Sequence, residues 1–257
     1  RSLLMLCKPF TEFANVGWLI TLVDMTEIRR ALQQRDQALH FISHDIRAPN
    51  ASILTLLEMQ RNSMEPLQAD ELLKRIEKYA QASLSMAESF VQLASAQSNE
   101  YRVAPLDLAS VLQDAVDDAW TQDSNQDVSV TILQIPHSAP CVGDRPLLAR
   151  AMANALNNAI KYSPARGTVR CSLYARGPNW IISIRDEGPG IDPAQQDRLF
   201  KPFSRLHDLT HPNISGVGLG LALVHTVVKR HGGSLEVESA VGQGVEFRLV
   251  LPAAAID

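Results

Sequence analysis

The chain has 257 residues, of which 46% are hydrophobic and 20% are charged, and its formal net charge is −4. This is an ordinary globular composition, and the length is sufficient for two domains. It excludes the strongly basic surface typical of nucleic-acid-binding proteins, so we expect no nucleic-acid partner.

The three cysteines, Cys7, Cys141 and Cys171, are far apart and form no CxxC pair. This spacing favours free thiols in a reducing compartment, and we expect a cytoplasmic location. The apolar segment 16–23 is far shorter than the ~18 residues that span a bilayer, so we expect no membrane contact within this fragment. Because the chain starts at Arg1 without a methionine, we interpret it as a fragment of a longer protein, which leaves an upstream membrane anchor open.

Residues 18–23 are rich in branched and aromatic side chains and predict a strand. Asp24 or Thr26 then provides a helix cap. A strand that ends in Asp-x-Thr and continues into a long helix resembles the end of a PAS sensor domain. We assign residues 1–26 to such a domain, with an arbitrary strand–helix junction as the alternative.

A helix is predicted over residues 27–61, followed by a turn at 62–66 and a second helix over 70–96. In the first helix Leu32, Leu39, Ile46 and Ile53 recur every seven residues, although Arg35 and Pro49 interrupt the intermediate positions. A helical hairpin cannot bury two apolar faces alone. We therefore predict a homodimer through residues 30–97, in which two hairpins form a four-helix bundle.

The segment 96–105 is polar and irregular and is predicted to be a linker. Beyond it helices and strands are mixed, which indicates an α/β sandwich with one sheet and one helical layer. The whole chain is therefore assigned to the α+β class. The expected helices are 108–120, 145–162 and 217–231, and the expected strands are 128–135, 168–175, 180–186, 234–239 and 244–251.

His44 stands in the segment His-Asp-Ile-Arg-Ala-Pro, residues 44–49. The heptad pattern puts it on the outer face of the first helix, where a neutral imidazole is exposed and nucleophilic. Asp45 beside it is suited to orient the ring or to accept its proton. A solvated surface histidine is the alternative.

Asn154 and Asn158 lie four residues apart, hence on one face of the predicted helix 145–162, whereas Asn157 falls off that face. Lys161 adds a positive charge suited to phosphate, and Tyr162 adds a flat aromatic face. The alternative is a helix whose polar residues simply face water.

Asp186-Glu187-Gly188-Pro189-Gly190 follows an apolar strand, and its glycines let the backbone pass close to another group. Further on, Gly216, Gly218 and Gly220 open the helix that begins near Leu219. Backbone N–H groups at such a helix start bind phosphates. No Gly-Lys-Ser/Thr follows, so this is not a Walker A loop.

These four segments, with Phe-Lys-Pro-Phe at 200–203 between the last two, resemble the sensor histidine kinases of two-component signalling. The resemblance covers about residues 30–255. The segment at His44 is similar to the phosphoacceptor box of that family, and the others are similar to the N, G1, F and G2 boxes of its ATP-binding domain. It implies a signalling helix with a dimerisation and phosphotransfer hairpin over 27–100, and a catalytic ATP-binding domain over 101–257.

The resemblance implies Mg-ATP-dependent autophosphorylation of His44, assisted by Asp45, and transfer of the phosphoryl group to an Asp of a response regulator. It further implies that Asn158 holds Mg²⁺ through its amide oxygen and that Asp186 accepts a hydrogen bond from the adenine amino group. Residues 204–215 are expected to form a lid, with Arg205 near the γ-phosphate. The expected ATP-binding residues are Asn154, Asn158, Lys161, Tyr162, Asp186, Gly188, Gly190, Arg205, Gly216, Gly218, Leu219 and Gly220.

The sequence departs from the family at Val217, where relatives often have Thr, and one hydroxyl contact is thereby missing. Two other functions stay open. One is an ATP-binding signalling scaffold with little or no turnover, which incubation with γ-labelled ATP would separate from a kinase. The other is an ATPase of the gyrase class, for which residues 30–97 would be dispensable.

Overall fold

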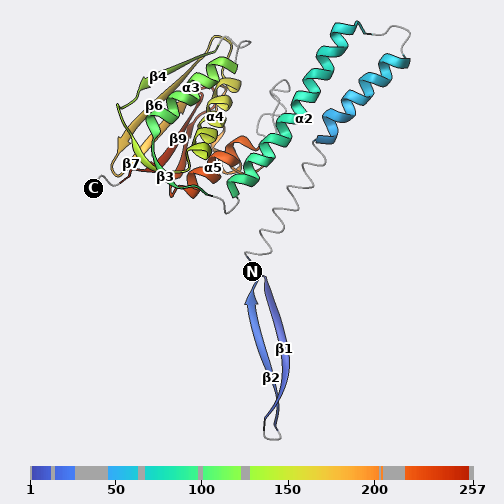
Figure 1. Ribbon diagram of the computed structural model, residues 1–257, viewed down its shortest axis with the longest axis vertical. Coiled ribbons are helices and arrows are strands. Elements are labelled where there is room, and N and C mark those ends of the chain that lie inside the picture. Colours follow the sequence, from blue (N-terminus) through green and yellow to red (C-terminus); the bar gives the residue numbers. More distant parts are fainter. Residues whose placement is uncertain are drawn as a thin grey trace. The chain divides into compact units, whose positions relative to one another are not determined.

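Figure 1 shows the fold of the chain, obtained as a computed structural model. The structure describes residues 2–12, 15–26, 46–62, 67–97, 101–122, 128–202, 204 and 218–254. The chain divides into two compact units, Arg1–Ala48 and Pro49–Asp257.

The first unit contains an antiparallel hairpin of β1 (Leu3–Glu12) and β2 (Asn15–Asp24), in register from Leu3 opposite Asp24. The predicted strand 18–23 is thus confirmed and is longer than expected. Strand β1 was not predicted, because Lys8-Pro9 interrupts its apolar pattern. The Asp24 side chain accepts a hydrogen bond from the Thr26 amide at 2.9 Å, and residues 27–45 of the predicted helix that follows lie outside the described residues.

The second unit begins within the first helix of a helical hairpin. The described part of its first helix runs over residues 46–62, and α2 spans Ala69–Gln97, which confirms the predicted helix 70–96. The Gln60 side chain closes the turn, because its amide group both donates to the carbonyl of Leu67 and accepts from the amide of Leu67, at 2.9 Å each.

A five-stranded sheet forms the centre of the remaining chain, in the order β4-β6-β7-β9-β8. Only the β4–β6 pair is parallel. The strands are β4 (Ser129–Gln134), β6 (Thr168–Arg176), β7 (Asn179–Arg185), β8 (Ser234–Ser239) and β9 (Val245–Pro252).

Three helices cover one face of this sheet (Figure 1), namely α3 (Leu108–Gln122), α4 (Arg145–Tyr162) and α5 (Gly220–Arg230). Side chains alternate along β6: Val169, Cys171 and Leu173 are fully buried against the helices, whereas the residues between them face the open side. This two-layer arrangement confirms the predicted α/β sandwich.

Two short strands were missed, β3 (Ala104–Asp107) and β5 (Pro140–Gly143), which pair antiparallel beside the main sheet. A short 3₁₀ helix, η1 (Pro193–Arg198), follows the turn after β7. Leu93 and Ala96 near the end of α2 are buried in the same core as α3, α4 and α5, so the hairpin packs directly on the sandwich. Among the helices in the described part of the chain, none combines the length and hydrophobicity that a membrane crossing requires.

Candidate nucleotide-binding site

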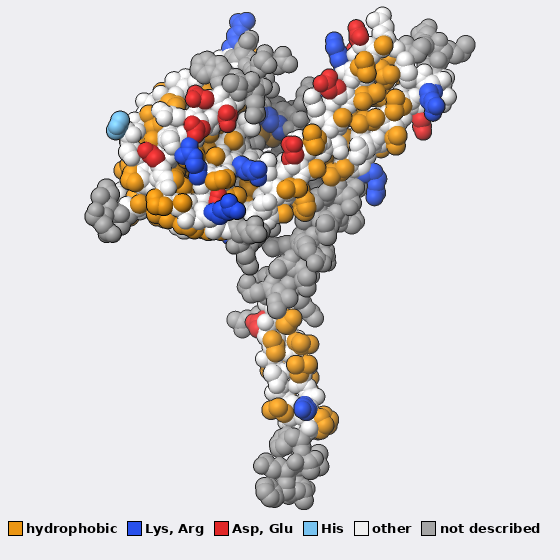
Figure 2. Space-filling model, viewed as in Figure 1, with side chains coloured by type: hydrophobic (Ala, Val, Ile, Leu, Met, Phe, Trp, Pro, Cys, Tyr) orange, Lys and Arg blue, Asp and Glu red, His pale blue; other side chains and the backbone are white. Residues whose placement is uncertain are grey.

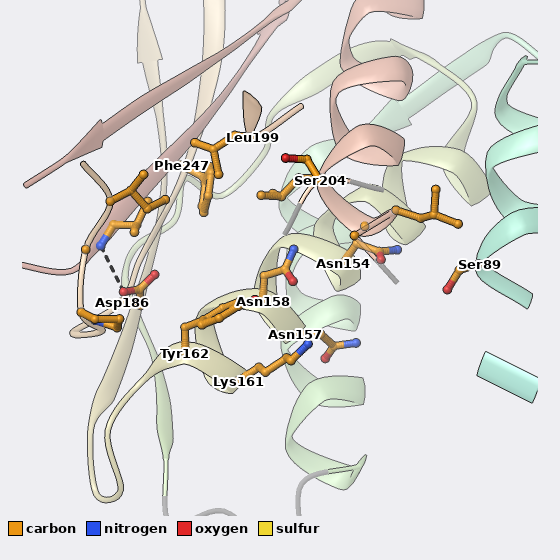
Figure 3. A pocket seen from close by; sticks show the side chains of 18 of the residues that line it. Ser89, Asn154, Asn157, Asn158, Lys161, Tyr162, Asp186, Leu199, Ser204 and Phe247 are labelled. Atoms are coloured by element: carbon orange, nitrogen blue, oxygen red, sulfur yellow. Dashed lines mark hydrogen bonds between the residues drawn. The ribbon is translucent and has the colours of Figure 1, made fainter. Parts of the chain in front are cut away.

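A cavity of about 280 Å³ lies where α4, the start of α5 and the turn after β7 meet (Figure 3). It has apolar walls from Ile191, Leu199 and Phe247 and polar groups at its two ends. Nine of the predicted binding residues line it, namely Asn154, Asn158, Lys161, Tyr162, Asp186, Gly190, Gly218, Leu219 and Gly220, whereas the predicted Gly188 does not. The structure therefore brings together, in one cavity, sequence segments that are separated by up to about sixty residues.

Asp186 forms one end of the cavity, directly after β7, and is only 3% exposed. Its Oδ1 accepts hydrogen bonds from the amide of Gly188 at 2.8 Å and from the amide of Val245 at 3.0 Å, the latter drawn as a dashed line in Figure 3. Burial raises the pKa of the Asp186 carboxyl, and the two amide hydrogen bonds oppose that effect. A carboxylate held in this way presents a fixed acceptor to a ligand.

The glycines of the turn are required by packing within the protein. A Cβ on Gly188 would lie 2.7 Å from the carbonyl oxygen of Tyr162. Gly190 has a φ of +71°, and a Cβ there would lie 1.9 Å from the carbonyl oxygen of Ala240 in the β8–β9 turn. The turn after β7 is therefore clamped between the end of α4 and the β8–β9 turn.

Helix α4 supplies the floor of the cavity. Its start is fixed by Asp144, whose side chain accepts a hydrogen bond from the amide of Leu147 at 3.1 Å. The Asn154 side chain donates to the carbonyl of Arg150 at 2.9 Å, which leaves its amide oxygen as the acceptor toward the cavity. Asn157 also lines the cavity, although its position in the helix had made it the poorer candidate.

The start of α5 forms the other end of the cavity. Gly218 has a φ of +72°, and the helix begins at Gly220 after the buried Leu219, which has no side-chain capping group. A Cβ on Gly220 would lie 3.0 Å from Oδ1 of Asn154, so a larger residue there would require the Asn154 side chain to shift. The first N–H groups of α5 are thus available to bind an anion.

Comparison with known proteins identifies the domain. A family model described as "Histidine kinase-, DNA gyrase B-, and HSP90-like ATPase" matches residues 143–255. The mycobacterial sensor histidine kinase MprB, a solved structure, is 32% identical over 98% of its own chain and 59% of this one, with a TM-score of 0.52. The chain belongs to the sensor histidine kinase family.

Curated histidine kinases match nearly the whole chain. The adaptive-response sensory kinase SasA of Synechocystis is 30% identical over 240 residues, which are 89% of this chain and 62% of SasA. SenX3 of Mycobacterium tuberculosis is 29% identical over 90% of this chain and 57% of its own length. The chain therefore spans about three fifths of the length of these relatives.

A further solved structure matches almost the whole of this chain. The structure of ThkA in complex with the response regulator protein TrrA covers 96% of this chain and 73% of its own chain with a TM-score of 0.70, at 19% identity. At that identity the likeness concerns the fold alone, and it extends across both the hairpin and the sandwich.

Four of the predicted site residues lie outside the described residues, namely His44, Asp45, Arg205 and Gly216. Their roles stay predictions. Of the two phenylalanines in the segment 200–203, Phe203 also lies outside, whereas Phe200 is half-buried against Ile191, Leu199 and Phe247. The ring of Phe200 stacks on that of His225 at a centroid distance of 5.3 Å.

The described residues contain no group of three or more His, Cys, Asp or Glu side chains that could hold a metal ion alone. The site is nevertheless chemically suited to Mg²⁺, because Asn154 and Asn158 place amide groups beside a helix start that is suited to phosphate. Magnesium usually takes one or two protein oxygens and completes its shell with phosphate oxygens and water.

Sequence reasoning missed two lining residues from a distant element, Ser85 and Ser89 on α2. Their spacing of four residues puts them on one side of that helix. Nothing in the local sequence links this pair to the cavity, because the link arises from the packing of α2 on the sandwich.

Proposed function

We propose that the chain is the kinase part of a sensor histidine kinase, which binds Mg-ATP in this cavity and transfers its γ-phosphoryl group to His44. The observation that supports the proposal is that the two ends of the cavity carry different groups, each suited to a different part of ATP. Asp186 is a fixed carboxylate suited to a base with an amino group, and the start of α5 is suited to phosphates.

The residues act mainly by positioning and by neutralising charge. Asp186 accepts a hydrogen bond from the adenine amino group, and the first amides of α5 donate to the phosphates. Lys161 adds positive charge, and its ammonium lies 5.5 Å from the centre of the Tyr162 ring. Asn158 would hold Mg²⁺, which supplies further charge neutralisation at the phosphates.

In the proposed reaction the unprotonated ring nitrogen of His44 attacks the γ-phosphorus. The bond between that phosphorus and its bridging oxygen breaks, and ADP leaves with the electron pair. The proton on the other ring nitrogen of His44 passes to Asp45. The phosphoryl group is then accepted by an Asp of a response regulator. We further propose that the chain acts as a homodimer through residues 30–97 and works in the cytoplasm.

Incubation with γ-labelled ATP and Mg²⁺ tests the proposal. We expect label that is stable in alkali and lost in acid, as for a phosphoramidate, and we expect no label in His44→Gln. A chelator should abolish labelling of the wild type. Binding of ATP should be unchanged in His44→Gln, because that residue belongs to the acceptor and not to the nucleotide site.

Acid-stable label, or full labelling of His44→Gln, would overturn the assignment of the acceptor. Tight ATP binding without any label would instead favour the signalling scaffold.

A further inference from the structure

Helix α2 of the hairpin contributes to the wall of the nucleotide cavity. Ser85 and Ser89 line it together with residues of α4 and α5. In Figure 3 Ser89 lies beyond Asn154, at the side of the cavity opposite Asp186. Because Asp186 faces the base in the proposed function, the two serines stand at the phosphate end.

The end of α2 is fastened to the sandwich by α5. The guanidinium of Arg230, the last residue of α5, donates a hydrogen bond to the carbonyl of Ala96. Ala96 is fully buried, and Leu93 one turn earlier is 4% exposed. The same guanidinium lies over the ring of Tyr101 in the linker, 4.8 Å from its centre. One arginine therefore holds both the end of α2 and the linker that follows it.

The linker is held from its other side by His231 and Asp144. The Tyr101 ring meets the His231 ring edge-on at a centroid distance of 5.1 Å. The amide of Arg102 donates to the Asp144 carboxylate at 3.0 Å, and the amide of Asp144 donates to Nε2 of His231 at 3.0 Å. We call Ala96, Tyr101, Asp144, Arg230 and His231 the linker clasp.

A glycine makes room for the linker clasp. A Cβ on Gly143 would lie 2.4 Å from the His231 ring, so β5 admits the imidazole only because that position has no side chain. The cluster thus joins four elements, α2, β5, α4 and α5, with its histidine only 8% exposed. Contacts this well buried fix the position of α2 relative to the cavity.

We propose that α2 forms the wall of the nucleotide site at its phosphate end, where Ser89 and Ser85 donate hydrogen bonds to the terminal phosphate of a nucleoside triphosphate. This inference rests on the proposed function. The Ser89 hydroxyl now donates to the carbonyl of Ser85 at 2.7 Å, and rotation about its Cβ–Oγ bond redirects the proton to a phosphate oxygen. A diphosphate is one group shorter and does not reach this wall.

The test compares ATP with ADP, both with Mg²⁺, by calorimetric titration of the full chain. Ser89→Ala should weaken ATP binding by about three- to tenfold, since one hydrogen bond is lost. Ser89→Asp should weaken it by about tenfold or more, because the new carboxylate repels the terminal phosphate. Binding of ADP should change by less than about twofold in both variants.

The linker clasp is tested by Arg230→Gln, which should reduce the preference for ATP over ADP, and by Tyr101→Phe, which keeps the ring and should retain that preference.

Ser95→Asp is the control for Ser89→Asp. It adds the same charge at an exposed position of α2 that does not line the cavity, and it should leave the affinities for ATP and ADP unchanged. Thermal melts establish that each variant is folded.

If folded Ser89→Asp kept the wild-type ratio of ATP to ADP affinity, the proposed contact of α2 with the terminal phosphate would be wrong. If Arg230→Gln kept that ratio, the proposed role of the linker clasp would be wrong. Failure of the proposed function is distinguishable, because the wild type would then bind neither nucleotide or would carry no label on His44.

Discussion

We expect Asp186 to decide which base the cavity accepts. Its carboxylate only accepts hydrogen bonds, so it suits the amino group of adenine and not the carbonyl of guanine. In Asp186→Asn the amide can present a donor, so ATP affinity should fall by about 10- to 100-fold and the discrimination against GTP should decrease. Titration with fluorescent adenine and guanine nucleotides measures both effects.

The matched control is Asp192→Asn. Asp192 is the exposed cap of η1, where its side chain accepts a hydrogen bond from the amide of Ala194 at 2.9 Å. Asparagine caps helices about as well as aspartate. The control should therefore bind both nucleotides as the wild type does, and an equal loss in the two variants would contradict the role of Asp186.

Gly190 offers a second prediction, on stability. Gly190 and Gly177 both have positive φ, +71° and +60°, but only Gly190 has a neighbour that an added Cβ would strike. Gly177→Ala should cost about 1–2 kcal/mol for the left-handed backbone alone. Gly190→Ala should cost several kcal/mol more, because the β8–β9 turn must move. The difference between the two variants in the free energy of unfolding, measured in urea, gives the cost of the clash. Equal losses of this free energy in both variants would show that the turn adapts freely.

These glycines also show how far single residues can be read from the sequence. Because Gly188 and Gly190 follow an apolar strand, the sequence predicted that the backbone there passes close to another group, without indicating which group. The close neighbours in the structure are protein carbonyls of Tyr162 and Ala240, which belong to elements distant in sequence.

Whole elements were predictable where local signals agreed. Helix α4 was predicted with its observed bounds, because Asp144 caps it, Pro146 stands in its first turn and apolar residues recur with helical period. Strands β3 and β5 were missed, since each has only four residues and contains a proline, Pro105 or Pro140. They form because they pair with one another.

The end of α5 carries a prediction about pH. His231 is buried, its Nε2 accepts from the amide of Asp144, and its Nδ1 bonds to the carbonyl of Val227 at 2.7 Å. Burial lowers the pKa of His231 below its ordinary value, with Arg230 adding to that effect and the Val227 carbonyl and Asp144 opposing it. The folded protein thus favours the neutral ring, which holds the linker clasp together.

The direction of the change in stability with pH follows from the linkage between proton binding and folding. The unfolded chain binds a proton at a pH where the folded chain does not, so stability is complete above about pH 6.5 and falls as the pH decreases toward the lowered pKa. Urea unfolding at pH 7.5, 6.5 and 5.5 should show this loss in the wild type, and a smaller one in His231→Asn. His225, whose pKa is also lowered by burial, should retain part of the slope.

At the scale of the whole molecule, some residues of the cavity could be predicted from the sequence and others could not. The residues from α4, β7 and α5 were predicted because their motifs carry the chemistry locally. Ser85 and Ser89 could not be predicted, because they precede those motifs by more than sixty residues. They enter the site only through packing of α2 on the sandwich. Such packing depends on contacts like that of Arg230 with Ala96, which leave no periodic signal.

Exposed apolar side chains on the hairpin indicate where another protein chain binds. Leu73, Leu84 and Val91 of α2 are 63%, 61% and 60% exposed in the single chain. Their intervals of eleven and seven residues return almost to the same side of a helix, so they form one apolar stripe. Figure 2 shows hydrophobic side chains gathered along the helical hairpin. Exposed apolar stripes of this kind mark interfaces between proteins.

We expect a second copy of the chain to cover this stripe and form a four-helix bundle. The double variant Leu84→Glu with Val91→Glu should therefore be monomeric in sedimentation equilibrium, because two carboxylates would be buried without partners. Lys78→Glu changes the net charge by the same two units on another side of α2 and should remain dimeric. Since the nucleotide cavity is lined by residues of one chain, the monomeric variant should still bind ATP. A wild type that sediments as a monomer, or a double variant that still dimerises, would show that this stripe is not the interface.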